Sequence, residues 1–281
     1  MAADGSYRVT GGAPAPDPAR VAAVAATLDT DPPETFAEPS RAAALDRLER
    51  ALGAVRTGDL TEASAQLTHA RSVLHDLSPD ALETRKGLGG MFDSRGRRLK
   101  RFRAGFANAT AGLADVAGDL AERIEGVTRR NGALDSAWDG LREAVGDLDT
   151  HLSAVFARLG PVADPADEPS PLHQRGATLA AGRDAALRTL PLIRRVQNTD
   201  ARLAASLARC REGIQTWRDD WKDGLGLAGR RPKRVRPDQT RLARTRDDLL
   251  ARIEAALAEL DTARARRIEI AARIEALRRP L

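Results

Sequence analysis

The sequence is poor in cysteine and in aromatic residues. Cys210 is the one cysteine among 281 residues, so no disulfide can form within the chain, and a reducing cytoplasm is the simplest expectation. Aromatic residues make up only 3% of the chain, whereas 42% of its residues are apolar, most of them alanine and leucine. With 30% charged residues, this composition favours long amphipathic helices over a sheet-centred enzyme core.

The sequence also lacks the motifs of common catalytic and membrane-spanning proteins. Its four histidines are scattered, without an HExxH or CxxC pattern, and no GxxxxGK[ST] loop is present. We therefore expect no metal site, no cofactor and no catalytic residue, that is, a protein that is not an enzyme. No apolar run approaches about 18 residues, and the N-terminus has no basic and apolar leader. We expect neither a transmembrane segment nor a secretory signal.

Proline content and helical periodicity divide the chain into three predicted parts. Residues 1–39 contain GGAPAPDP and DTDPPETFAEPS, which predict a disordered tail with one transient turn. Residues 40–84 carry two apolar stripes at helical spacing and predict a small helical hairpin. Residues 85–281 carry longer stripes and predict a long antiparallel helical bundle. The predicted fold class is all-α, with an elongated bundle of coiled-coil-like helices.

The longest stripe lies between residues 92 and 160 and follows a heptad repeat. A second apolar position alternates with the first at steps of three and four, with one stutter near Leu120. Asn131 is the polar member of this seam, and Trp138 follows it one heptad later. We expect both to help fix the register of the helices. Every seventh residue is apolar: Phe92, Leu99, Phe106, Leu113, Leu120, Val127, Leu134, Leu141, Leu148 and Val155.

Positive charge is concentrated in two short runs. The net charge is +5; RGRRLKRFR begins the heptad segment, and RRPKRVRP lies in the linker before the last helix. One long helix out and one long helix back would bring both runs to the same end of the bundle. The predicted binding surface therefore consists of eleven cations: Arg95, Arg97, Arg98, Lys100, Arg101, Arg103, Arg230, Arg231, Lys233, Arg234 and Arg236.

Three interpretations of these cations remain open. They could be a solvated helix start and linker with no partner, they could bind an anionic membrane surface or an acidic protein, or they could bind nucleic acid. Basic clusters beside amphipathic helices hold anionic lipid, and the same charges neutralise DNA phosphates. The lack of stacking aromatic residues and of helix-turn-helix spacing disfavours sequence-specific reading of DNA. We therefore expect a protein partner or an anionic membrane surface, with nucleic acid as the alternative and homo-oligomerisation left open.

The segment 89–152 resembles the toxic-anion (tellurite) resistance family, which is also called TelA-like. Weaker similarity continues through LPLIRRVQNTDARLAASL, so that the resemblance covers about half of the chain. Arg130 stands where the family's Arg-Asp-Asn-Ala-x-Leu-Glu-like segment has Asp, and Gly132 where it has Ala. The matching positions are Arg129, Asn131, Leu134 and Asp135, with Trp138 following.

The resemblance implies a bacterial, cytoplasmic protein linked to tellurite tolerance and to the envelope stress response, without established catalytic residues. Combined with the two cationic runs, it favours a non-enzymatic helical scaffold or adaptor that docks peripherally at the inner membrane surface or on an acidic partner. A nucleic-acid-associated helical protein that uses the same cations is the alternative.

Overall fold

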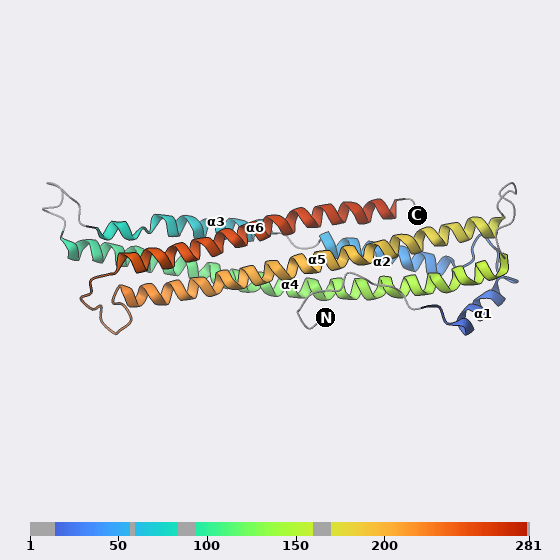
Figure 1. The fold of residues 1–281 in the computed structure, drawn as a ribbon, viewed down its shortest axis with the longest axis horizontal. Helices are drawn as coiled ribbons and strands as arrows, with labels where there is room; N and C mark the ends of the chain where they lie inside the picture. Colours follow the sequence, from blue (N-terminus) through green and yellow to red (C-terminus); the bar gives the residue numbers. More distant parts are fainter. Residues whose placement is uncertain (1–14, 57–59, 84–93, 160–169, 280–281) are drawn as a thin grey trace. The chain divides into compact units, whose positions relative to one another are not determined.

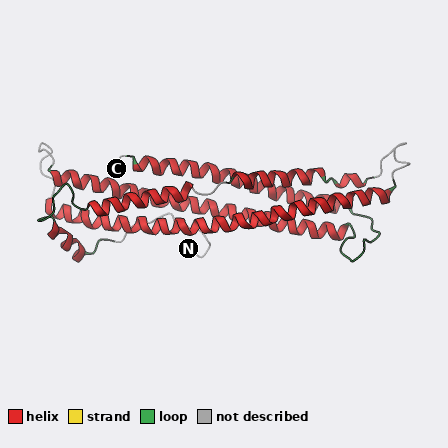
Figure 2. Ribbon diagram, turned by 180° about the vertical axis from the view of Figure 1, so that it is seen from behind, coloured by secondary structure: helices red, strands yellow, loops and turns green. Residues whose placement is uncertain are grey.

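A computed structural model describes residues 15–56, 60–83, 94–159 and 170–279 (Figure 1). Figure 2 shows that all regular structure in these ranges is helical, which confirms the all-α prediction. The elements are α1 (Pro18–Thr27), α2 (Glu38–Arg56), α3 (Thr61–Asp76), the 3₁₀ turn η1 (Pro79–Leu82), α4 (Arg95–Leu159), α5 (Pro171–Gly224) and α6 (Gln239–Arg278).

Helix α5 contains an internal proline. Pro191 lies inside α5, which is one continuous helix from Pro171 to Gly224. Proline removes one backbone hydrogen bond, and the packing of the flanking turns outweighs this loss. Residues 160–169, between α4 and α5, lie outside the described residues.

The contacts of the chain divide it into two compact units. Helices α4, α5 and α6 each contribute one part to each unit, whereas α2 belongs to the first unit and α3 to the second. This grouping differs from the predicted ranges 40–84 and 85–281, because α2 and α3 each pack on the long helices of their own unit. The first unit comprises the described residues of 1–57, 129–200 and 265–281, and the second those of 58–128 and 201–264.

The core of the first unit is formed by one apolar stripe from each of α2, α4, α5 and α6. Within it, α4 and α5 are antiparallel, since Gln197 donates to the Asn131 carbonyl at 3.1 Å and Arg183 pairs with Asp149 at 2.8 Å. Burial of these stripes supplies most of the unit's stability, at about 25 cal/mol per Å² of apolar surface. The stripes include Leu48, Leu52, Val55, Leu134, Leu141, Val145, Ile193, Val196, Ile270 and Ile274.

Residues 15–39 take part in the first unit, which differs from the disordered tail predicted for the first 39 residues. Phe36 is only 2% exposed, because it packs in an apolar cluster with side chains of α4 and α5. Arg175 donates to the Phe36 carbonyl at 2.6 Å and to Glu38 at 2.7 Å. Hydrogen bonds from Arg41 and Arg175 lower the pKa of the Glu38 carboxyl to about 2. The prediction of disorder rested on the proline content and therefore missed the burial of Phe36.

The core of the second unit contains a cluster of aromatic side chains. Phe102 of α4 stacks on Trp221 of α5 with ring centroids 5.6 Å apart, and Phe106 lies 5.3 Å from Trp217. Because the earlier residue of α4 meets the later residue of α5, these two contacts show that α4 and α5 are antiparallel in this unit as well. Large aromatic rings add specific geometry to the area that they bury. Leu67, Leu74, Leu113, Leu120, Ile214, Leu249, Ile253 and Leu260 complete this core.

The heptad seam predicted for α4 supplies the buried face of that helix. From Phe102 to Val155, all seam residues are buried except Ile124 and Asn131, which are half-buried. The cores of both units therefore depend on the same repeat. The seam is least apolar around Asn131, whose side-chain Oδ1 is buried without a hydrogen-bond partner among the described residues.

A buried ion triad lies beside this polar position in the first unit. Asp200 of α5 is fully buried and accepts hydrogen bonds from Arg130 of α4 at 2.9 Å and from Arg267 of α6 at 2.6 Å. Arg130 and Arg267 are only 8% and 7% exposed. Burial, together with the charge of Arg130, lowers the pKa of Arg267. The seam pattern pointed to Asn131 and missed its neighbour Arg130, which carries the interhelical contact.

We expect Asp200→Asn to lower the free energy of unfolding by about 3–5 kcal/mol, because it removes the carboxylate that two buried guanidinium groups share. Denaturant-induced unfolding measures this change. Asp184→Asn is the control: Asp184 pairs with Arg188 on an exposed helix face, so its loss should cost less than about 1 kcal/mol. Equal losses in the two variants would contradict the role of the triad.

Candidate functional site

The first cationic run forms the beginning of α4 in the second unit. Ser94 precedes the helix, and its carbonyl accepts a hydrogen bond from the Arg97 amide at 2.9 Å. Helical residues three or four positions apart share a face, so Arg98 lies on the same side as the buried Phe102. Arg95, Arg97, Lys100 and Arg101 are exposed, Arg103 is half-buried and Arg98 is buried.

The second cationic run lies in the loop of residues 225–238 between α5 and α6. Gly226 follows α5 with φ +67°, a left-handed conformation that favours glycine. The loop folds back here, because the Lys233 amide donates to the Gly226 carbonyl at 2.9 Å. A Cβ atom at Gly226 would come within 2.8 Å of the Val235 side chain, so the turn also needs the space. The loop exposes Arg230, Arg231, Lys233, Arg234 and Arg236.

Arg103 joins the two runs. Its guanidinium donates to the Leu225 carbonyl at 2.9 and 2.6 Å and to the Lys233 carbonyl at 2.7 Å. This contact, which we call the Arg103 clamp, holds the start of α4 against both arms of the loop. The predicted proximity of the two runs is therefore confirmed. Arg103 itself was predicted to meet a partner, and the structure instead uses it within the fold.

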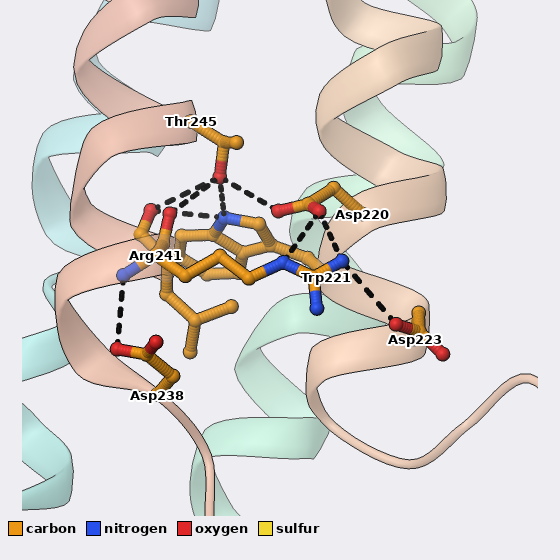
Figure 3. Close-up of polar contacts among 7 residues, drawn as sticks. Asp220, Trp221, Asp223, Asp238, Arg241 and Thr245 are labelled. Carbon is orange, nitrogen blue, oxygen red and sulfur yellow. Dashed lines mark hydrogen bonds and ion pairs between the residues drawn. The ribbon is translucent and has the colours of Figure 1, made fainter.

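Two carboxylates at the end of α5, next to the loop, accept hydrogen bonds from side chains of α6. Figure 3 shows Arg241 between Asp220 and Asp223, with hydrogen bonds of 2.5 and 3.2 Å. Asp220 also accepts a hydrogen bond from the Thr245 hydroxyl at 3.1 Å, and Asp238 accepts one from the Arg241 amide at 3.1 Å. These acids hold the end of α5 and the start of α6 together through Arg241 and Thr245. The sequence pattern did not reveal this role of Arg241.

A hollow of about 420 Å³ lies between the two runs. Arg95 and Arg98 of α4 and Arg236 of the loop line it, together with Glu83 and Gln239. Guanidinium groups bind phosphate and carboxylate oxygens through paired hydrogen bonds, so the hollow suits an anionic group. The sequence predicted the three arginines but not Glu83 or Gln239, which only the three-dimensional fold brings here. We refer to the eleven predicted cations, as placed here, as the basic surface.

Asn131 and Trp138, the predicted register residues, lie in the first unit and do not belong to the basic surface. The Trp138 ring is contacted by the guanidinium of Arg194 at 4.1 Å from its centroid and by that of Arg142 at 5.6 Å. Arg194 also pairs with Asp135 of α4. The two contacts of Arg194 join α5 to α4, whereas Arg142 belongs to α4 itself. The role of Asn131 and Trp138 in register stays a prediction.

The described residues offer neither a reactive thiol nor a metal-binding group. Cys210 is fully buried on α5, and burial raises the pKa of its thiol to about 11. The thiolate is the reactive form of cysteine, so little of it is present near neutral pH. Within the described ranges, no three His, Cys, Asp or Glu side chains come together as a metal-binding group.

We expect Cys210 to resist a thiol-specific reagent in the native protein at mildly alkaline pH and to react completely after denaturation, because its thiol is both buried and protonated. Mass spectrometry of the labelled protein measures the modified fraction. Ala205→Cys, at an exposed position of the same helix, is the control and should react rapidly in the native state. Labelling of native Cys210 at a similar rate would contradict its assigned burial.

Arg103→Met should loosen the basic loop, because methionine keeps an apolar stem but cannot donate to the two carbonyls. We expect trypsin to cut the native protein within 230–236 roughly tenfold faster. This corresponds to a loss of about 1.4 kcal/mol in the free energy that holds the loop closed. Arg101→Met is the control: it removes one charge and one tryptic site of the same run at an exposed position, and it should leave the rate of cleavage within 230–236 unchanged. The clamp would be refuted if both variants were cut at the wild-type rate.

Together, the fold and this site define an all-α helical bundle in which two cationic runs meet. In sequence, the chain is similar to Protein KlaB of Escherichia coli: the two are 25% identical over 240 residues, which cover 75% of this chain and 64% of KlaB. The match thus spans less than two thirds of that relative. No protein-family model and no solved structure matches the chain. None of the described helices is long and apolar enough to cross a membrane.

Proposed function

We propose that this protein is a non-enzymatic helical scaffold that docks through its basic surface to an anionic membrane. The observation that carries the proposal is the Arg103 clamp, which brings two cationic runs more than 120 residues apart in sequence onto one surface. Nine of the eleven cations on this surface are exposed, all except Arg98 and Arg103. Each cation near an anionic bilayer contributes about 1 kcal/mol, so their combined effect is enough for peripheral binding.

A lipid surface fits the arrangement better than single-stranded nucleic acid does. Binding of single strands combines cations with exposed aromatic rings on which bases stack. Phe102, which lies between Arg101 and Arg103 in sequence, is buried and stacks on Trp221 in the core. Binding to the DNA backbone needs no such rings, and it is therefore the alternative that the experiment must separate.

Two similarities support a place among toxic-anion resistance proteins as part of this proposal. The segment 89–152 resembles that family, and the chain is similar to Protein KlaB over 75% of its length. The raised pKa of Cys210 favours a structural role over direct reduction of a tellurium oxyanion, because such a reaction would need an accessible thiolate or another electron source. In this proposal, the protein contributes to tolerance of toxic anions by holding partner proteins at the membrane.

The proposal predicts stronger binding to vesicles of phosphatidylcholine and phosphatidylglycerol than to vesicles of phosphatidylcholine alone. Co-sedimentation at several salt concentrations measures the affinity. Arg231→Glu combined with Arg234→Glu should weaken binding to the anionic vesicles at least about tenfold, because it reverses two charges on an exposed loop.

Arg202→Glu combined with Arg209→Glu is the matched control. Both residues are exposed on α5, outside the basic surface, and the change in net charge is the same. If the control weakened binding as much as the loop variant, only total charge would matter, and the proposed docking surface would be wrong. If duplex DNA bound with a steep salt dependence while anionic vesicles did not, the nucleic-acid alternative would replace this proposal.

A further inference from the structure

The hollow in the basic surface gathers charges from two elements that lie far apart in the sequence. Arg95 and Arg98 come from the first turn of α4, and Arg236 comes from the loop before α6. Arg95 and Arg236 are exposed, whereas Arg98 is only 6% exposed, so its charge is largely withdrawn from solvent. Among the described residues that line the hollow, Glu83 is the one acid. Three guanidinium groups and one carboxylate leave an excess of two positive charges.

The first residues of two helices also line the hollow. Arg95 begins α4 and Gln239 begins α6. The N–H groups of a first helical turn carry partial positive charge, which stabilises a nearby anion and destabilises a nearby cation. The first turn of α4 nevertheless contains no acidic residue, and Arg95, Arg97 and Arg98 all lie in it. An anion in the hollow would offset the repulsion among these charges and the helix end.

The rest of the wall that the described residues form is apolar. Leu82, Leu99 and Pro237 line the hollow and are half-buried. A cleft that combines charges of one sign with apolar walls focuses the electric field and raises the local concentration of counter-ions. The volume of about 420 Å³ lies within the range of small-ligand pockets, which is about 300–1,000 Å³. The hollow therefore has room for a whole anionic headgroup.

We infer that the hollow is a specific site for a phosphate monoester, carried by a lipid headgroup of the membrane. This inference rests on the proposed membrane docking and names the group that the basic surface selects. Near neutral pH a phosphate monoester carries close to two negative charges and presents three acceptor oxygens. These match the excess charge of the hollow and the donors of its three arginines. A phosphodiester or a carboxylate carries one negative charge and leaves part of the excess unbalanced.

Vesicles of equal surface charge test this selectivity. Phosphatidylcholine vesicles that contain phosphatidic acid, a monoester, are compared with vesicles that contain phosphatidylglycerol, a diester, and the two lipid fractions are adjusted to the same zeta potential. We expect the full chain to bind the phosphatidic acid vesicles at least about fivefold more tightly in co-sedimentation, because the monoester can engage all three guanidinium groups. Attraction by net charge alone would give equal affinities.

Arg95→Gln and Arg236→Gln should each reduce the preference for phosphatidic acid to less than about twofold, because glutamine removes one charge from the hollow and keeps a polar side chain. Arg97→Gln and Arg234→Gln are the matched controls: both residues are exposed in the same helical turn or the same loop, and neither lines the hollow. The controls should weaken binding to both kinds of vesicle equally and keep the preference. Since all four positions are exposed, the thermal unfolding temperatures should match that of the wild type.

Calorimetric titration with glycerol 3-phosphate and with dimethyl phosphate separates a lipid source from a soluble one. We expect weak binding of the monoester, lost in Arg236→Gln, and no binding of the diester. Equal binding to the two kinds of vesicle, or equal loss of preference in Arg236→Gln and Arg234→Gln, would overturn the inference and leave the proposed docking intact. Binding of glycerol 3-phosphate without binding to any anionic vesicle would overturn the lipid source and, with it, the proposed docking.

Discussion

Two guanidinium groups share one buried carboxylate in the first unit, and this requirement fixes how α4, α5 and α6 are aligned there. An apolar seam alone tolerates a slip of one heptad, because one leucine then replaces another. Asp200 does not tolerate such a slip, since it would be buried away from Arg130 and Arg267, and an isolated buried charge costs several kcal/mol. The triad thus selects one alignment among several that the apolar residues would accept.

The second unit uses a different device for the same purpose. Arg103 binds backbone carbonyls instead of a carboxylate, so it organises the basic loop without cancelling the positive charge of that surface. The carboxylates of Asp220 and Asp223 are directed to Arg241. Arginine therefore has two roles within one small region: some residues hold the loop in place, and others are presented to solvent. Composition alone does not distinguish these roles.

Much of the fold could be predicted from periodicity, because the apolar residues of α4 repeat every three and four positions and are nearly all buried. The meeting of the two cationic runs could also be predicted, whereas their role as a binding surface stays a prediction. The triad could not, because its members lie 70 and 67 residues apart and each is an ordinary charged residue in a helix. Burial of Phe36 was missed for a related reason: one aromatic residue among prolines carries no periodic signal. Arg98 shows the same limit, since its burial depends on which face of α4 the fold covers.

The division into two units has a consequence for the order in which the chain can fold during synthesis. The first unit joins residues from both ends of the chain: Arg56 pairs with Glu275 and Arg278 with Glu49, 219 and 229 residues apart. The segments of the second unit lie between these, and its last segment ends at residue 264. All segments of the second unit are therefore synthesised before the final turns of α6, which the first unit must wait for. Until then, the apolar stripe of α2, although made early, has no complete core to enter, and this is the period in which such a surface is most open to aggregation or to chaperones.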